Sequence, residues 1–125
     1  MNSLPKQILF VSNDDRCFES VNRKLNYEEE SYALTPALTA DQALFLMTDE
    51  TFDLYILDSL LKDTSSVELC RRLREKDRET PNLFFRGDEQ QLAKAQIALK
   101  PESHEFLDKS NDLDRLAETV KKILM

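Results

Sequence analysis

Short runs of consecutive apolar residues alternate with segments of helical periodicity along the whole chain. The runs predict five strands, at 8–11, 32–35, 54–57, 82–85 and 105–107. Continuous apolar runs such as Ile8–Val11 are typical of strands that are buried on both faces. A segment with helical spacing follows each strand, including one at 89–99 that ends before Pro101. Five β–α units in a row predict a parallel sheet with helices on both faces.

Two of the predicted helices begin at a capping box. Thr39 and Gln42 form the first, and Ser65 and Glu68 form the second. In this motif the first side chain caps the helix, and the second reaches back to the backbone that precedes it. The second of these helices is expected to lose its regular pattern in a charged run that starts at Arg71.

The chain carries a net negative charge, which argues against nucleic acid as a partner. With 24 Asp and Glu residues against 17 Lys and Arg residues, the formal net charge is −7. Such a surface repels phosphate backbones, so direct binding to nucleic acid is not expected. No apolar run is long enough to cross a bilayer, and the first ten residues do not resemble a signal peptide, so no membrane association is expected.

Glycine, cysteine and histidine are too scarce to build several common sites. The only glycine, Gly87, excludes Gly-rich phosphate-binding loops. Cys17, Cys70 and the lone His104 lack the spacing of a zinc site. The two cysteines are predicted to be reduced and buried, which implies a cytoplasmic location.

Polar residues follow the predicted strands at the edge where open α/β sheets bind ligands. Ligands in such folds bind at the carboxyl ends of the strands. Asp58 follows the third strand, Arg86 the fourth, and Lys109 comes shortly after the fifth. The run Ser-Asn-Asp-Asp at 12–15 follows the first strand.

This layout resembles the receiver domain of bacterial response regulators. The run Asp-Leu-Tyr-Ile-Leu-Asp-Ser-Leu-Leu at 53–61 resembles the phosphoacceptor strand of that family. The run Glu-Phe-Leu-Asp-Lys at 105–109 resembles its aromatic-Leu-x-Lys stretch, and 39–44 looks like the start of its second helix. The resemblance covers nearly the whole chain. It implies one domain over residues 1–125 with a flavodoxin-like (βα)5 fold, a doubly wound, five-stranded parallel sheet with helices on both faces.

The resemblance assigns Asp58 as the candidate phosphoacceptor and Lys109 as its cationic partner. A carboxylate can attack phosphorus when Mg²⁺ neutralises the incoming oxygens, and a lysine acts there as a mobile point charge. The alternative is that Asp58 is a solvated loop acid and Lys109 an ordinary surface lysine.

Three positions that would contact the metal or the phosphoryl group depart from the family pattern. Ser12 and Asn13 stand where the family has two acidic Mg²⁺ ligands. Mg²⁺ usually needs at least one or two carboxylates, so the site is expected to bind the ion weakly or not at all. Asp14 is one residue further on and is a candidate replacement ligand. The alternative is that Asp14 and Asp15 begin the next helix near its positive end.

Arg86 stands where the family has a Ser or Thr that binds the phosphoryl group. We expect Arg86 or Lys109 to form an ion pair with Asp58 and to hold the site in one state. The alternative is that Arg86 turns outward, toward solvent or toward Asp88.

Three functions compete for this layout. The first is a conventional phosphoreceiver that takes phosphate from a histidine kinase on Asp58. The second is an atypical receiver that acts through protein contacts, with weak or no Mg²⁺-dependent phosphorylation. The third is an unrelated enzyme, but the residues at 12–15 do not suit an FMN loop, and Leu60 stands where a DxD phosphatase needs an Asp. The sequence favours the atypical receiver, which is not an enzyme, and keeps the conventional receiver as the alternative.

The resemblance implies signalling proteins as partners, either a histidine kinase or a downstream effector. In receivers the face made by the fourth helix, the last strand and the fifth helix carries most partner contacts. Lys94, Ile97 and Phe106 are expected on that face. Association into a homodimer is left open.

Overall fold

The computed structural model describes residues 4–27, 32–58, 61, 63–85, 105–108 (backbone only) and 113–124. Its strands are β1 (Lys6–Val11), β2 (Tyr32–Ala37), β3 (Leu54–Asp58), β4 (Asn82–Phe85) and β5 (Glu105–Asp108). Its helices are α1 (Asp15–Leu25), α2 (Ala40–Asp49), α3 (Ser66–Lys76) and α5 (Leu113–Ile123). The five predicted strands are confirmed, and the helix predicted at 89–99 lies outside the described residues.

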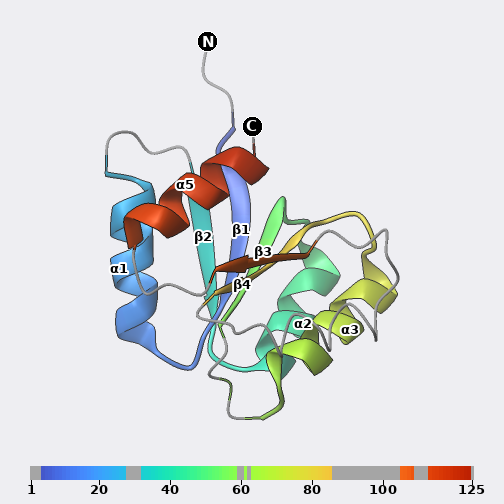
Figure 1. Cartoon of the computed structure of the whole chain (residues 1–125). Helices are drawn as coiled ribbons and strands as arrows, with labels where there is room; N and C mark the ends of the chain where they lie inside the picture. Colours follow the sequence, from blue (N-terminus) through green and yellow to red (C-terminus); the bar gives the residue numbers. More distant parts are fainter. Residues whose placement is uncertain are drawn as a thin grey trace.

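The five strands form one parallel sheet in the order β2-β1-β3-β4-β5. Helices α1 and α5 cover one face of this sheet, and α2 and α3 cover the other (Figure 1). The doubly wound, flavodoxin-like fold expected from the sequence is therefore confirmed. Among the described helices, none combines the length and the apolar character needed to span a membrane.

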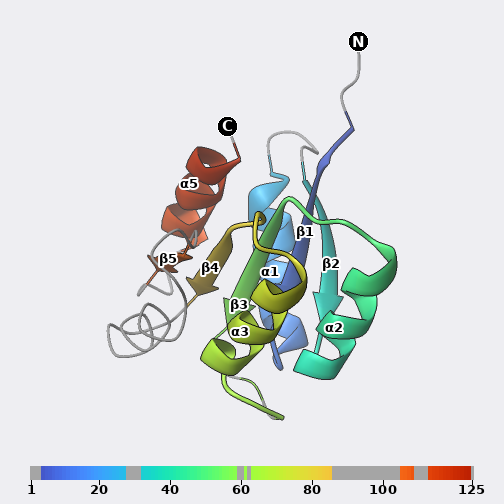
Figure 2. The same cartoon turned by 90° about the vertical axis from the view of Figure 1, so that its right-hand side faces the viewer.

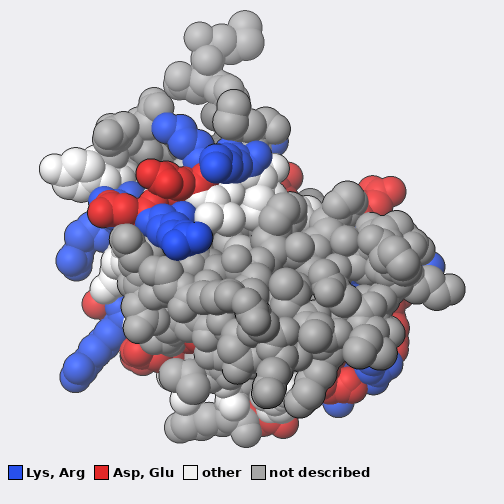
Figure 3. Space-filling view, viewed as in Figure 1, with Lys and Arg blue, Asp and Glu red and all other residues white. Residues whose placement is uncertain are grey.

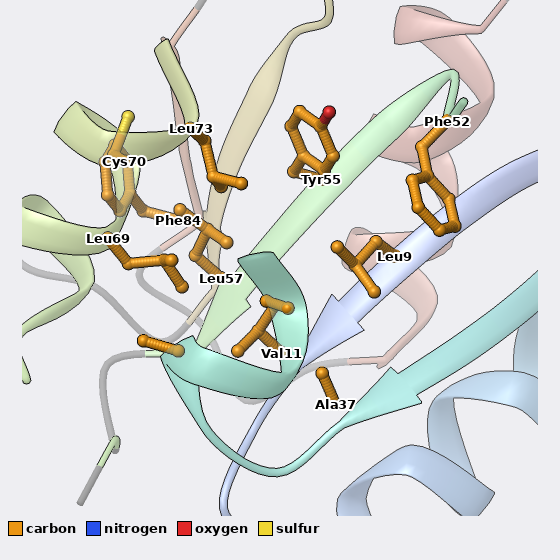
Figure 4. Packing of buried hydrophobic residues seen from close by; sticks show 12 residues of the cluster. Leu9, Val11, Ala37, Phe52, Tyr55, Leu57, Leu69, Cys70, Leu73 and Phe84 are labelled. Carbon is orange, nitrogen blue, oxygen red and sulfur yellow. The ribbon is translucent and has the colours of Figure 1, made fainter. Parts of the chain in front are cut away.

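The apolar runs are buried on both faces because successive side chains in a strand point to opposite sides. One set packs against α2 and α3, as Figure 4 shows, and includes Leu9, Val11, Tyr55, Leu57 and Phe84. The other set packs toward α1 and α5 and includes Ile8, Phe10, Leu54, Ile56, Leu83 and Phe85. Alternation within continuous apolar runs thus gives each face of the sheet its own hydrophobic core.

The first predicted capping box is confirmed. Thr39 Oγ1 accepts a hydrogen bond from the backbone N–H of Gln42 at 3.1 Å, as predicted for the N-cap of α2. The Gln42 side chain reaches back and accepts from the N–H of Leu38 at 2.7 Å.

The second capping box is half confirmed. Ser65 Oγ accepts from the N–H of Glu68 at 3.0 Å, but the Glu68 carboxylate binds Arg71 instead of reaching back. Arg71 also pairs with Glu75 one turn later. These pairs at helical spacing support α3 through its charged end, so the helix continues to Lys76 rather than losing its pattern at Arg71.

A hydrogen-bonded cluster fixes the turn between α3 and β4 against β3. Asp77 Oδ2 accepts from Tyr55 Oη at 2.8 Å and from Thr80 Oγ1 at 2.5 Å. Burial raises the pKa of Tyr55, and the bond to Asp77 raises it further. Burial alone raises the pKa of Asp77, but bonds from Thr80 and Tyr55 outweigh that effect and hold it below its usual range.

Removal of the Tyr55 hydroxyl should destabilise the fold. We expect Tyr55→Phe to lower the free energy of unfolding in urea by about 1 kcal/mol, because the ring stays packed while Asp77 loses one donor. A carboxyl with a depressed pKa stabilises the fold above its unfolded pKa, so the difference should narrow as the pH falls below about 4. Tyr27→Phe is the control, since Tyr27 is 81% exposed. An equal loss in both variants would contradict the assignment.

Candidate functional site

Ser12 and Asp58 meet at the carboxyl edge of the sheet. Val11 of β1 is paired with Leu57 of β3, so the residues that follow them lie side by side. Ser12 Oγ donates a hydrogen bond to Asp58 Oδ2 at 2.6 Å. Both side chains are buried, with Ser12 3% exposed and Asp58 0% exposed. A short bond from a hydroxyl to a buried carboxylate is of the charge-assisted, stronger kind.

Ser12 is held in place from three directions. Its backbone N–H donates to the carbonyl oxygen of Ala37, at the end of β2, at 3.0 Å. Its hydroxyl oxygen also accepts from the N–H of Asp14 at 3.1 Å. The hydroxyl therefore donates to Asp58 and accepts from the loop, which fixes its orientation.

Asp14 caps α1. Its Oδ1 accepts from the backbone N–H groups of Arg16 and Cys17, at 3.1 and 3.4 Å. Asp15 is the first residue of the helix, near its positive end. The interpretation of Asp14 and Asp15 as the start of a helix is therefore confirmed. Asn13 lies half-buried between Ser12 and this cap.

The ends of β4 and β5 are in register with Asp58 at the end of β3. Asp58 is paired with Phe85 at the end of β4, and Phe85 is paired with Asp108 at the end of β5. Arg86 and Lys109 directly follow those two residues but lie outside the described residues. Their ion pair with Asp58 stays a prediction.

The expected partner face is also outside the described part of the chain. Lys94 and Ile97 belong to the undescribed segment 86–104, and Phe106 is described only as a backbone position in β5. Contacts through these three residues stay a prediction.

The described oxygen donors at this edge offer Mg²⁺ little negative charge. The ion prefers near-octahedral oxygen ligands with one or two carboxylates among them. Of the described carboxylates at this edge, Asp14 and Asp63 cap helices α1 and α2, and one oxygen of Asp58 accepts the hydrogen bond from Ser12. In the described part of the chain, no three His, Cys, Asp or Glu side chains gather into a candidate metal site.

Asp63 is a structural residue of this edge that sequence reasoning missed. Its two carboxylate oxygens accept from the N–H groups of Ala40 and Asp41 at 3.1 and 3.3 Å, so it caps α2 from a distant position. Slight burial raises the pKa of Asp63, but these backbone bonds outweigh it and lower the pKa. Asp63 therefore connects the segment that precedes α3 to the start of α2. No local motif could have revealed a cap supplied from 23 residues away.

Comparisons with known proteins agree with this architecture. The sequence profile of the response regulator receiver domain matches residues 8–121. The chain is 32% identical over 85 residues to the transcriptional regulatory protein ResD of Bacillus subtilis, which covers 66% of this chain and 34% of ResD. The chain spans about a third to a half of the length of the curated relatives it matches.

Solved structures show the same fold. A response regulator receiver domain from Methanospirillum hungatei matches with a TM-score of 0.81 at 22% identity, over 97% of this chain and 94% of that one. Response regulator TrrA of Thermotoga maritima, solved in complex with Mg²⁺-BeF, matches with a TM-score of 0.79 at 26% identity. That match covers 95% of this chain and 99% of TrrA.

Proposed function

Because the chain belongs to the response regulator receiver domain family, we propose that it is a two-component signalling module of the atypical kind. In this proposal Asp58 is held by the protein's own side chains, and the module acts through protein contacts rather than as an enzyme. The observation that carries the proposal is the 2.6 Å hydrogen bond from Ser12 Oγ to Asp58 Oδ2.

Ser12 affects both the negative charge of the site and the availability of the Asp58 carboxylate. Attack on phosphorus needs a carboxylate lone pair and a cation that neutralises the incoming phosphoryl oxygens. The Ser12 hydroxyl takes up one oxygen of Asp58 and brings no negative charge to attract the cation. Asn13 brings none either, and Asp14 is committed to the cap of α1.

The two cationic residues that follow β4 and β5 also have a role in this proposal. Arg86 or Lys109 forms an ion pair with Asp58 in place of the metal and the phosphoryl group. At a buried carboxylate such a cation compensates the cost of desolvation, which an unpaired charge would have to bear. Its role is to hold one state of the site.

A conventional phosphoreceiver is the second candidate. Asp58 favours it, because this carboxylate ends β3 at the edge where parallel sheets bind ligands. The structural similarity to TrrA, which was solved with Mg²⁺-BeF, points the same way. The two candidates differ in whether Mg²⁺ and phosphate reach Asp58.

The extent, location and partners of the module are part of the same proposal and are inferred from the family. The module comprises residues 1–125, lies in the cytoplasm, and exchanges signals with a histidine kinase or an effector. Its contacts use the face that includes Lys94, Ile97 and Phe106, and this face also serves any homodimer.

A calorimetric titration with Mg²⁺ tests the metal side of the proposal. We expect no saturable binding at millimolar Mg²⁺, because a single, partly occupied carboxylate cannot displace enough water from this strongly hydrated ion. Asp58→Ala is the control and should give the same trace as the wild type. Saturable binding that disappears in Asp58→Ala would restore the conventional receiver.

A further inference from the structure

A groove beside the Asp58 site runs along the β2 edge of the sheet, and Ser12 lines one of its two depressions. We call it the β2 groove and define it by Phe18, Pro36, Leu38, Gln42 and Phe45. It joins a depression of about 400 Å³ between β2 and α2 to one of about 300 Å³ that reaches α1. The two depressions share Pro36 and Gln42 as a common wall. Figure 2 shows β2 at the edge of the sheet with α2 beside it.

Large apolar side chains line this groove in contact with water. Phe45 is 71% exposed and Leu38 is 41% exposed, and Pro36 between α2 and the edge is exposed as well. On α2, Leu44 and Met47 pack against the core, whereas Phe45 lies on the outer face of the helix. Contiguous exposed apolar surface of this kind is typical of interaction sites.

Carboxylates flank the apolar floor of the groove. Asp41 lines the depression beside Phe45, and Asp15 lines the one beside Phe18. Asp49 is exposed two helical turns after Asp41, with Phe45 midway between them on the same face of α2. An occupant of the groove therefore meets negative charge along the length of its apolar contact.

The charge of the chain is concentrated in the segment that builds this edge. Residues 25–61, which include β2 and α2, contain eight acidic residues and no Lys or Arg. The rest of the chain has 16 acidic and 17 basic residues, so this segment accounts for the whole net negative charge. Much of the Lys and Arg visible in Figure 3 gathers over α1 and α5. Lys24 of α1 forms an ion pair with Asp114 of α5 across the two helices.

We propose that the β2 groove binds a cationic amphipathic helix of a partner protein. Its apolar side chains fill the two depressions, and its Lys or Arg side chains face Asp15 and Asp41. An apolar helix face laid in a groove, with opposite charges on the rim, is a recurring mode of recognition. Pro36 disfavours the addition of a partner strand, because it offers no N–H at this point of the sheet edge.

The test uses a synthetic helical peptide of Leu and Lys residues with a fluorescent label, titrated with the whole chain. We expect saturable binding by fluorescence anisotropy that weakens with added salt. Phe45→Ala should weaken it about tenfold, as the loss of a central aromatic contact does. Tyr27→Ala removes an aromatic side chain outside the groove that is at least as exposed as Phe45, and binding should stay within about twofold of the wild type.

Charge and location are tested with matched variants. Asp41→Asn should weaken binding about threefold, while Glu118→Gln on the exposed face of α5 should not. Amide chemical-shift changes should centre on β2 and α2, and circular dichroism should show that every variant is folded. Equal effects of Phe45→Ala and Tyr27→Ala would overturn the proposal, as would equal binding of a Leu and Glu peptide. Self-association that Phe45→Ala abolishes would replace the partner helix with a second copy of the chain.

Discussion

A chain that carries Ser12→Asp, Asn13→Asp and Arg86→Thr together should bind Mg²⁺ and accept a phosphoryl group from acetyl phosphate on Asp58. The two new carboxylates restore the charge that the first strand lacks, and the threonine restores a hydroxyl donor at the end of β4. Two added charges near a partly buried ion should raise Mg²⁺ affinity by on the order of a hundredfold or more. Calorimetry measures the metal, and a Phos-tag gel measures the modification.

The same triple variant should also show a stability signature. Without metal, three carboxylates crowd one buried edge and repel one another, so the thermal midpoint should fall below that of the wild type. Mg²⁺ should raise it again, because a ligand that binds only the folded state stabilises that state. Adding Asp58→Ala to the triple variant is the control and should abolish the modification. If the triple variant gains neither metal binding nor phosphate, these three positions are not what disables the site.

The bond between Ser12 and Asp58 should appear as a coupling energy in a double-mutant cycle. Ser12→Ala in the wild type should cost about 1.5–3 kcal/mol of unfolding free energy, as expected for a buried hydrogen bond to a charged group. In an Asp58→Ala background the same change should cost well under half as much, because the acceptor has gone. Urea unfolding of the four proteins gives the coupling.

Ser66→Ala provides a matched control for this cycle. Ser66 is a buried serine, and its hydroxyl has no hydrogen-bond partner among the described residues. Removing that hydroxyl should leave stability unchanged or raise it, since no bond is lost and a desolvated polar atom disappears. Additive losses for Ser12→Ala and Asp58→Ala would mean that their contact does not stabilise the fold.

Most of the fold could be predicted because its strands are local, apolar and regularly spaced. The runs at 8–11 and 54–57 needed no partner information to be identified as buried strands. Helix ends were harder. The run from Arg71 contains pairs between Glu68, Arg71 and Glu75 that prolong α3, and such support depends on side-chain geometry that a charge count does not contain.

The position of Asp58 could be predicted, but the identity of its neighbour could not. A carboxylate that follows an apolar run must lie at the edge of the sheet, whatever the register. Contact with Ser12 depends on the pairing of Val11 with Leu57, residues 46 positions apart, and spacing alone does not determine such a register. For the same reason the sequence showed that Ser12 replaces an acidic residue, but it did not show that Ser12 donates a hydrogen bond to Asp58.

The most direct test of this account is the mass of the intact wild-type chain after incubation with acetyl phosphate and millimolar Mg²⁺. The account predicts an unchanged mass, because Ser12 hydrogen-bonds one oxygen of Asp58 and neither Ser12 nor Asn13 adds negative charge to hold the metal. The triple variant under the same conditions shows that the assay can detect the modification. A wild-type chain that gains one phosphoryl group, and loses that gain in Asp58→Ala, would contradict the central claim.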